Sequence, residues 1–353
     1  MLSYWILFAA PVISGMAPYR LHGAAQKVGI AIGAVLLTVA IGLRYRVGCD
    51  WFNYIVAMDE VNFAGPIDAM AIATDPGYGL ISWLSLKLHL DIYGINAFCA
   101  TIFCWGLFAF AGKQPLRWLT IVIAVPMLII VVAMGFTRQA AAIGFLMLAF
   151  AAFSEKSLVK FLIFVALATT FHKTAVIMAP LAILIDPKRK IGPVVIGGLA
   201  TAALAAAFLT SKFDALTHNY IGNAEWEGEG AAAIYRLGLN LLAAIAFFFC
   251  RKRWAAKYDD TRMYFALSGA AIAAFPFAFL EPVAADRMSL YLLPYQCAVF
   301  ARLPDIYGRR LGGWIAAAAI LASAVLMHVW FTFANNSWCW IPYHNLVLPD
   351  LID

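Results

Sequence analysis

The segment WLTIVIAVPMLIIVVAMGFTRQAAAIGFLMLAFAAF, residues 118–153, consists of two apolar runs joined by Gly135-Phe136-Thr137-Arg138-Gln139. Apolar runs of this kind predict membrane-spanning helices, which need about 20 residues to cross the hydrocarbon core. The rest of the chain repeats the pattern, because 64% of its 353 residues are hydrophobic, 12% are charged and the mean hydropathy is +0.84. This composition excludes a soluble globular protein and requires lipid as the solvent.

Apolar runs separated by charged links predict an all-α, polytopic helical bundle in the membrane, formed by a single domain over residues 1–353. One further run, Gly77 to Leu90, is brief and follows Asp75-Pro76. We expect it to be a re-entrant helix, whose ends protein or a water-filled cavity must cover. About twelve full spans are expected, at residues 2–17, 28–43, 92–111, 118–134, 140–153, 158–170, 174–185, 191–210, 235–250, 263–280, 288–301 and 313–333.

Lysine and arginine predict the orientation of the chain, because they accumulate in cytoplasmic loops. With the N-terminus outside, 17 of the 25 Lys and Arg residues fall in inner links and 8 in outer links. The acidic residues divide the other way, with 5 inside and 14 outside. If Gly77 to Leu90 were a full span, everything before it would invert. The re-entrant interpretation is preferred because it places all the polar motifs described below on one outer face.

The six cysteines show no metal-ligand spacing. Cys49 and Cys339 both fall in outer segments, where an oxidising compartment could act on them. A disulfide between them is not the favoured interpretation, because the sequence does not show that they meet. The other four lie within or at the ends of apolar runs and are expected to be small packing residues: Cys99, Cys104, Cys250 and Cys297.

Polar residues gather in five short motifs at the outer ends of apolar runs. Ionisable groups near the hydrocarbon usually face a partner, a cavity or a substrate path, so this placement indicates one shared polar site. The motifs are Arg44 to Tyr54, Asp75-Pro76-Gly77-Tyr78, Gly135 to Gln139, Phe171-His172-Lys173-Thr174 and Glu281 to Arg287.

Arginines in these motifs indicate recognition of a phosphate or diphosphate, because guanidinium stays charged and binds phosphate oxygens in a bidentate fork. The alternative is that they pair with nearby carboxylates and hold helix ends together. That alternative is favoured for Arg44, which could also extend to the interface. The phosphate role is favoured for Arg138 and Arg287, which lie close to long apolar runs.

His172 is a candidate general base, since imidazole titrates near neutral pH, although a structural hydrogen-bonding role is equally compatible with its position. Asp50 is the second candidate base, unless it pairs with Arg46 four residues earlier. Asp75-Pro76-Gly77-Tyr78 predicts a turn or a helix start. The tail Trp338 to Tyr343 could stack on sugar rings, but an interfacial aromatic belt explains it equally well.

These motifs in this order resemble the EpsG family of polysaccharide polymerases, a branch of the Wzy-like enzymes. The sequence departs from the family pattern at two positions: Cys49 stands where a small hydroxyl residue is expected, and Asp75 where glutamate is common. Neither departure removes a candidate catalytic group. The resemblance spans most of the chain and is carried by Arg44 to Tyr54, Asp75 to Tyr78, Thr137-Arg138-Gln139, Phe171 to Ala175, Asp286-Arg287-Met288 with Tyr291, and Trp340 to Tyr343.

The resemblance implies glycosyl transfer at the outer side of the bacterial inner membrane, from a growing chain on undecaprenyl diphosphate to a hydroxyl of the next lipid-linked repeat unit. Diphosphate is a good leaving group, so the protein must position both lipids, stabilise negative charge and remove a proton. We assign Arg138 and Arg287 to the diphosphate, and His172 as the base with Asp50 second. Further substrate contacts are expected from Arg46, Arg44, Asn53, Tyr54, Asp75, Tyr78, Gln139, Lys173, Trp340 and Tyr343.

No metal or cofactor is expected, because arginines can supply the charge stabilisation. The expected partners are undecaprenyl-diphosphate-linked oligosaccharides and membrane lipid, with a chain-length regulator and a flippase as candidate protein partners, and no nucleic acid. Two other functions stay open: a transporter or flippase for a lipid-linked or anionic solute, and a membrane acyltransferase with His172 as its base. Transporters usually show related halves or interrupted helices in matching positions, and none is visible in this sequence.

Overall fold

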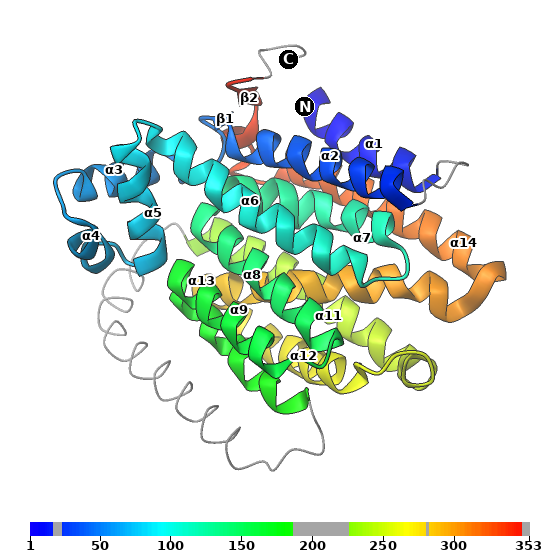
Figure 1. The fold of residues 1–353 in the computed structure, drawn as a ribbon. Coiled ribbons are helices and arrows are strands. Elements are labelled where there is room, and N and C mark those ends of the chain that lie inside the picture. Colours follow the sequence, from blue (N-terminus) through cyan, green and yellow to red (C-terminus); the bar gives the residue numbers. More distant parts are fainter. Residues whose placement is uncertain (17–22, 186–225, 280–281, 348–353) are drawn as a thin grey trace.

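The computed structural model describes residues 1–16, 23–185, 226–279 and 282–347, which form a bundle of helices with one two-stranded sheet (Figure 1). The α-helices are α1 Leu2–Met16, α2 Gly23–Gly42, α3 Trp51–Val61, α4 Pro66–Ile72, α5 Pro76–Lys87, α6 Asp91–Gly112, α7 Arg117–Ala124, α8 Thr137–Ser154, α9 Leu158–Phe171, α11 Trp226–Ala255, α12 Thr261–Ala274, α13 Pro282–Ser289 and α14 Leu293–Phe333. The remaining elements are the π-helix η1 Val125–Ala133, the 3₁₀-helices η2 Lys173–Leu184, η3 Phe275–Phe279, η4 Leu290–Leu292 and η5 Ser337–Trp340, and the strands β1 Arg44–Tyr45 and β2 His344–Asn345.

Helices α6 and α8 form the centre of the bundle, and α8 is buried along nearly its whole length. A helix that is apolar on all sides belongs in a core rather than on a surface. Small residues let the two backbones meet: a Cβ on Gly106 would lie 2.0 Å from the carbonyl oxygen of Gly144. Close approach through small residues is the usual way in which helices pack inside a membrane. The backbone of α8 is therefore held closely against α6 at Gly144, within the same helix whose first turn contains Arg138.

The expectation of an all-α membrane protein is confirmed, but the count of about twelve spans is not. Among the described residues, six helices are long and apolar enough to cross a membrane. Four shorter apolar helices, which include α1 and α9, have 10 to 17 residues. The expected span at 191–210 lies outside the described residues. The orientation of the bundle stays a prediction.

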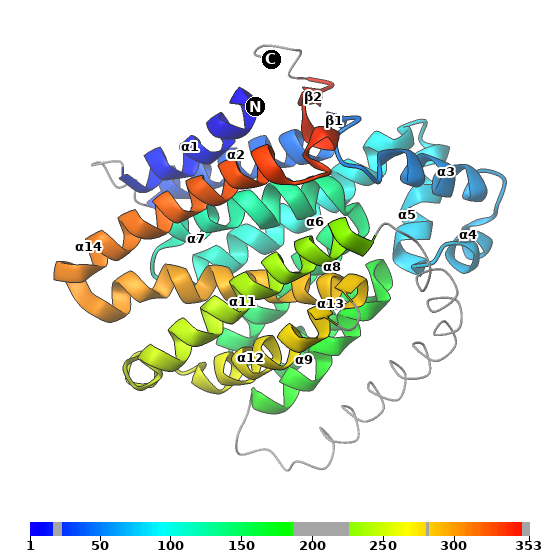
Figure 2. The same ribbon diagram turned by 180° about the vertical axis from the view of Figure 1, so that it is seen from behind.

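The two last expected spans meet in the long helix α14: the span 288–301 begins at the end of α13, crosses η4 and continues into α14, and the span 313–333 is the second half of α14. Gly308 interrupts α14 with φ 76° and ψ 178°, a backbone conformation that glycine adopts readily. The chain turns there, so that the second half of α14 runs back toward β2, as Figure 2 shows from behind. One glycine thus converts a single helix into two antiparallel arms.

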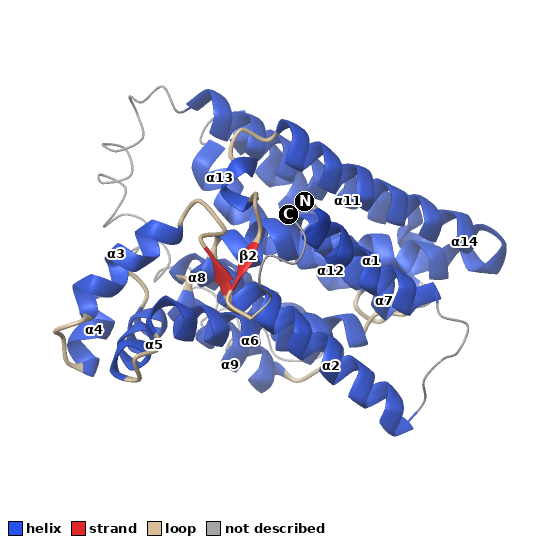
Figure 3. Ribbon diagram, turned by 90° about the horizontal axis from the view of Figure 1, so that it is seen from above, coloured by secondary structure: helices blue, strands red, loops and turns tan. Residues whose placement is uncertain are grey.

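Short elements gather at one end of the bundle, which we call the cavity end. Helices α3, α4 and α5 project there, and β1 pairs with β2 in the register Arg44↔Asn345 (Figure 3). The run expected to be re-entrant forms α5, which has 12 residues and begins at Pro76. The helix start predicted for Asp75-Pro76 is confirmed, whereas a half-inserted position in the membrane stays a prediction.

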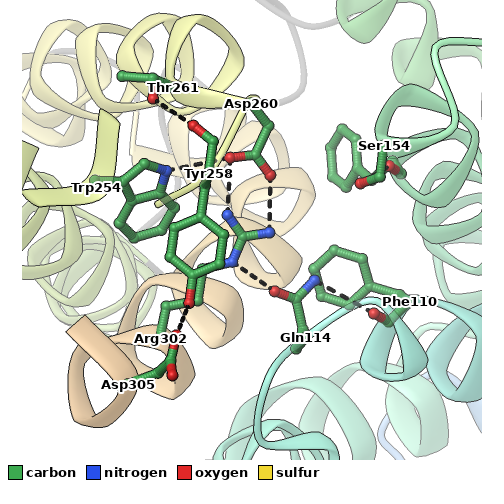
Figure 4. A network of polar contacts seen from close by, with 10 residues as sticks. Phe110, Gln114, Ser154, Trp254, Tyr258, Asp260, Thr261, Arg302 and Asp305 are labelled. Atoms are coloured by element: carbon green, nitrogen blue, oxygen red, sulfur yellow. Dashed lines mark hydrogen bonds and ion pairs between the residues drawn. The ribbon is translucent and has the colours of Figure 1, made fainter. Parts of the chain in front are cut away.

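The opposite end of the bundle, where α14 bends, contains a buried network around Arg302 (Figure 4). The guanidinium donates to Gln114 Oε1 at 2.8 Å and forms two contacts of 2.8 Å with the Asp260 carboxylate. The Trp254 indole donates to the same carboxylate at 3.1 Å. Three aromatic rings surround the guanidinium, with centroid distances of 4.3 to 4.8 Å. We call this the Arg302 end.

Candidate functional site

A cavity of about 250 Å³ lies at the cavity end, between the short helices α3 to α5 and the ends of α8, α9 and α13. All five sequence motifs contribute residues to it, so they meet around one cavity, as the prediction of a shared site requires. Glu281, in the fifth motif, lies outside the described residues, although Arg287 of that motif does line the cavity. The polar residues that line the cavity are Asp50, Asn53, Tyr54, Glu60, Thr74, Tyr78, Ser82, Arg138, Gln139, His172 and Arg287.

Asp75 connects two of these motifs. Its carboxylate is buried and accepts a hydrogen bond from Arg138 Nη1 at 3.0 Å and another from the Lys173 backbone N–H at 3.0 Å. Asp75 occupies the N-cap position of α5, yet its side chain does not cap that helix. Gly77 permits the arrangement, because a Cβ there would lie 2.6 Å from the Thr170 hydroxyl oxygen on α9. The Asp-Pro-Gly motif therefore brings α5 against α9 and orients Arg138.

Arg138 begins α8 and faces the cavity between two aromatic rings. Its guanidinium carbon lies 5.9 Å from the ring centroid of Tyr54 and 5.8 Å from that of Tyr78. The side chain remains 34% exposed, in contrast to the 2% of its partner Asp75. Burial raises the pKa of Tyr54 to about 12, so its hydroxyl stays protonated. The arginine is thus held in place on one side and open to a ligand on the other.

His172 lies in the link between α9 and η2, where three polar atoms contact one another. Its Nδ1 lies 2.8 Å from Thr174 Oγ1 and 2.7 Å from the Tyr291 hydroxyl oxygen. The two hydroxyl groups are themselves 2.7 Å apart. This triangle fixes the orientation of the imidazole ring, and His172 also lines the cavity.

Electrostatics lower the basicity of His172 and raise that of Asp75. Burial lowers the pKa of His172 from 6.5 to about 3, and the positive charges of Arg138 and Arg287 act in the same direction. The imidazole is therefore neutral at neutral pH. Burial also raises the pKa of the Asp75 carboxyl, although Arg138 and the backbone N–H of Lys173 oppose that shift.

Arg287 reaches the cavity from α13, whose backbone is anchored on both sides. Gln139 Nε2 donates to the carbonyl oxygen of Arg287 at 2.7 Å, and Asn240 Nδ2 donates to that of Ser289 at 3.0 Å. The neighbouring Asp286 forms a bidentate ion pair with Arg236 of α11. Within the described part of the chain, no carboxylate pairs with Arg287 itself. Its charge is available to an anion in the cavity.

The structure places Arg44 and Arg46 outside the cavity, although both are predicted substrate contacts. Arg44 is buried, and its guanidinium donates to the carbonyl oxygen of Ile41 at 2.6 Å and to Thr137 Oγ1 at 2.8 Å. Arg46 is exposed and stacks on the rings of Tyr45 and Phe52, with no carboxylate among the described residues within ion-pair distance. Arg44 thus joins chain segments, as the structural alternative predicted, but through carbonyl and hydroxyl oxygens rather than a described carboxylate. Asp50 does not pair with Arg46.

The aromatic tail also lies apart from the cavity. The Trp340 indole is buried, donates to the Ile130 carbonyl at 2.9 Å, and packs so closely that a Cβ on Gly135 would lie 2.6 Å from it. The Tyr343 hydroxyl donates to the Ala40 carbonyl at 2.8 Å. Trp340 thus packs against η1 and the link before α8, and Tyr343 packs against α1 and α2. Stacking of Trp340 or Tyr343 on a sugar would require this packing to open.

Cys49 and Cys339 form a disulfide, which the sequence analysis did not favour. The pairing of β1 with β2 brings the two segments together, and the Gly48 backbone N–H donates to the Cys339 carbonyl oxygen at 2.9 Å. Strands of two residues leave no readable pattern in a sequence, so their pairing could not be anticipated. The four cysteines expected to be packing residues are free and buried.

Three polar residues of the site were missed: Glu60, Thr74 and Ser82, which line the cavity. Tyr291, which carried part of the family resemblance without a predicted role in the site, contacts His172. Ser82 follows Tyr78 by one helical turn, so the i, i+4 spacing on α5 was a usable signal. No described group of three or more His, Cys, Asp or Glu residues is arranged to hold a metal ion. The groups that the site offers are guanidinium, imidazole, carboxylate and hydroxyl.

The family model of the EpsG family matches residues 29–345, which covers most of the chain and every residue that lines the cavity. No curated protein and no solved structure matches the chain. EpsG-like proteins are Wzy-like polymerases, which agrees with a membrane-embedded helical bundle. The chain therefore belongs to the EpsG family, as its ordered motifs predicted.

Proposed function

We propose that this protein is a polysaccharide polymerase that transfers a growing glycan from undecaprenyl diphosphate onto a lipid-linked repeat unit, at the outer face of the bacterial inner membrane. The observation that carries the proposal is the cavity itself, which brings Arg138, Arg287 and His172 together from three separate elements. The bond that breaks joins the anomeric carbon of the donor to the diphosphate. The bond that forms joins that carbon to the acceptor hydroxyl oxygen.

In the proposed reaction, Arg138 and Arg287 bind the diphosphate. Arg138 is oriented through Nη1 by Asp75, while Arg287 has no carboxylate partner in the described residues. Guanidinium groups held in place before the reaction stabilise negative charge as the leaving group departs, without reorganisation. Asp75 acts as a positioning residue, because it contacts Arg138 and the Lys173 backbone and is not among the residues that line the cavity.

His172 is the base of the proposed reaction, and Nε2 is the nitrogen that would act. Nδ1 contacts Thr174 Oγ1 and the Tyr291 hydroxyl oxygen, and one of these hydroxyls donates to the other. We place the hydrogen of the neutral imidazole on Nδ1, where it donates toward these hydroxyl oxygens. That tautomer leaves the lone pair on Nε2, which would accept the proton of the acceptor hydroxyl.

The charge of the substrate would activate this base. In the empty cavity, burial and the neighbouring positive charges lower the pKa of His172 to about 3. A bound diphosphate brings negative charge beside the imidazole, and an opposite charge favours the protonated form. The pKa of His172 would rise as charge develops on the leaving group. Proton transfer would then accompany departure of the diphosphate.

The test uses purified protein with lipid-linked repeat units extracted from cells that lack the polymerase gene. Wild-type protein should convert single repeat units into longer saccharides still attached to one lipid. The other outcomes identify the rival functions: lipid moved across a vesicle membrane without extension indicates a flippase, and acylated sugar indicates an acyltransferase. Deletion of the gene should in turn leave single lipid-linked repeat units in cells.

A further inference from the structure

Two buried hydroxyl groups on α5 have no hydrogen-bond partner among the described residues. They are the Tyr78 hydroxyl and Ser82 Oγ, and both side chains line the cavity. Tyr78 is 4% exposed and Ser82 is 2% exposed. Buried polar groups are nearly always hydrogen-bonded, and an unsatisfied one carries the cost of its lost contact with water. The two residues lie one helical turn apart and line the same cavity, so the unsatisfied hydroxyls indicate a polar ligand there whose groups would reach and satisfy them.

The surrounding wall is rich in groups that bind hydroxyls. Asp50 and Asn53 of α3, Glu60 at the end of α3 and Thr74 before α5 line the same cavity. Asn53 Nδ2 donates only a long contact, 3.4 Å, to Asp50 Oδ1, which leaves both groups capacity for further bonds. We define the α3–α5 wall as Asp50, Asn53, Glu60, Thr74, Tyr78 and Ser82.

The charges of the two sides of the cavity are opposite. Arg138, Arg287 and the neutral His172 lie on the side built by α8, α13 and the α9–η2 link, whereas the α3–α5 wall contributes the carboxylates of Asp50 and Glu60. A diphosphate on the arginine side would compensate the two positive charges there. A second anionic group against the α3–α5 wall would then face two carboxylates, and like charges repel at such distances.

We propose that the α3–α5 wall binds an uncharged, hydroxyl-bearing sugar residue of the lipid-linked substrate and disfavours a sugar that carries a carboxylate. This inference rests on the proposed function and specifies its substrate class. Carboxylates, amides and hydroxyls are suited to sugar hydroxyls, because each can accept a hydrogen bond from O–H and the amide and hydroxyls can also donate one. The sugar belongs either to the donor or to the acceptor, and the chemistry of the wall suits both.

The first experiment separates ligand binding from a structural role. Tyr78→Phe and Ser82→Ala remove hydroxyl groups that lose no protein partner, so the unfolding temperature of the substrate-free protein should stay the same or rise. The KM of one lipid-linked saccharide should rise about 3- to 10-fold, since a hydrogen bond to substrate is lost. The KM is measured for a lipid-linked oligomer as donor and a single repeat unit as acceptor, each varied separately. The KM that rises assigns the wall to that substrate.

The matched controls are a serine and a tyrosine whose hydroxyl groups do have partners within the protein. The Ser85 hydroxyl, three residues after Ser82, donates to the Asp91 carbonyl at 2.6 Å, and the Tyr295 hydroxyl lies 2.7 Å from Ser268 Oγ. Neither residue lines the cavity. Ser85→Ala and Tyr295→Phe should lower the unfolding temperature and leave both KM values unchanged. Unchanged KM values in Tyr78→Phe and Ser82→Ala, with extension intact, would overturn the inference and leave the proposed function standing.

The second experiment tests the charge preference. The probes are the repeat-unit saccharide released from its lipid by mild acid, and the same saccharide with its primary alcohols oxidised to carboxylates. The carboxylated probe should inhibit extension by wild-type protein at least about 10-fold more weakly than the neutral one. Glu60→Gln removes one carboxylate of the wall, so it should reduce the difference in inhibition between the two probes. Asp59→Asn changes an exposed neighbour outside the cavity and should leave that difference unchanged. Equal inhibition by both probes in wild type would contradict the inference.

The two proposals fail in distinguishable ways. If wild-type protein extends no lipid-linked saccharide at all, the proposed function is wrong. If wild type extends the saccharide but neither the hydroxyl variants nor the charged probe changes the outcome, only the assignment of the α3–α5 wall is wrong.

Discussion

The two ends of the bundle each contain an arginine paired with a buried aspartate, but the two arginines differ in how many of their donors remain open to a ligand. Arg302 has a 3% exposed side chain, binds Asp260 and Gln114, and is enclosed by aromatic rings (Figure 4). Arg138 has a 34% exposed side chain, binds Asp75 through one nitrogen, and lines a cavity. An arginine whose donors are occupied by the protein holds the fold together. An arginine with donors left over indicates a ligand.

His172→Ala gives the largest expected effect at the cavity end. Removal of a positioned base typically lowers a rate by about 10²- to 10⁴-fold, so chain extension should fall by that factor while membrane abundance stays normal. Extension is measured in vitro at equal protein amounts. His328→Ala, which changes an exposed histidine of α14 far along the sequence from the site, is the matched control and should extend normally. Near-normal extension by His172→Ala would remove the base assignment.

At the Arg302 end, Arg302→Ala should lower the stability of the protein and should not change the chemistry at the cavity end. It leaves the Asp260 carboxylate buried without its cation, and breaking a buried ion pair costs about 3–5 kcal/mol of the free energy of unfolding. We expect low membrane abundance and a reduced unfolding temperature in detergent. Arg309→Ala, at an exposed position of the same helix, should change neither quantity. Normal stability of Arg302→Ala would show that the network around it is dispensable.

The charged and titratable residues of the cavity end could be picked out from the sequence, for a physical reason. Arg138 and His172 stand out because charged or titratable groups interrupt runs that are otherwise apolar. Ser82 carries no charge, so it cannot be distinguished from an ordinary helical serine until the structure shows that its hydroxyl lacks a partner among the described residues. The burial of Trp340 could not be anticipated from the sequence, because it depends on tertiary packing over Gly135.

The Arg302 end could not be recognised from the sequence. Gln114, the pair Trp254 and Asp260, and Arg302 come from three different links between apolar runs, and nothing in their spacing indicates that the three links meet. Basic and acidic residues in such links predict orientation rather than partners. The disulfide between Cys49 and Cys339 was missed for the same reason, because two-residue strands set its geometry.

The pH dependence of stability distinguishes the buried His172 from an exposed histidine. Its pKa is about 3 in the folded protein and 6.5 as a free side chain, so between these values the unfolded chain binds a proton that the folded chain does not. Its contribution to stability is fully present above pH 6.5 and is lost as the pH falls, at no more than about 1.4 kcal/mol per pH unit.

Unfolding temperatures from pH 7 to pH 5 test this prediction. Wild type should lose more stability on acidification than His172→Asn, which has no imidazole to protonate. The raised pKa of Asp75 acts in the opposite direction but is common to both proteins, so the difference between them isolates His172. Identical acid sensitivity of the two proteins would contradict burial of a neutral imidazole.

Tyr291→Phe gives the smallest expected effect. The change keeps the ring but removes the hydroxyl that contacts His172 Nδ1 and Thr174 Oγ1. Loss of one orienting hydrogen bond should lower the extension rate by up to about 10-fold and leave abundance normal. The pH profile of the extension rate should also shift, because the hydroxyl contacts Nδ1 and so influences the protonation of the imidazole. A purely structural tyrosine would lower abundance and leave the pH profile of the remaining protein unchanged.

The most direct test of the central claim compares Arg138→Lys with Arg302→Lys. Lysine keeps the charge at both positions but cannot reproduce the bidentate fork of guanidinium. Membrane abundance and chain extension per molecule are measured together for both variants. We expect Arg138→Lys to reach normal membrane abundance with little chain extension. We expect Arg302→Lys to have low membrane abundance but normal chain extension per molecule. Normal extension by Arg138→Lys, or an extension defect in fully abundant Arg302→Lys, would contradict the assignment of function to the cavity end.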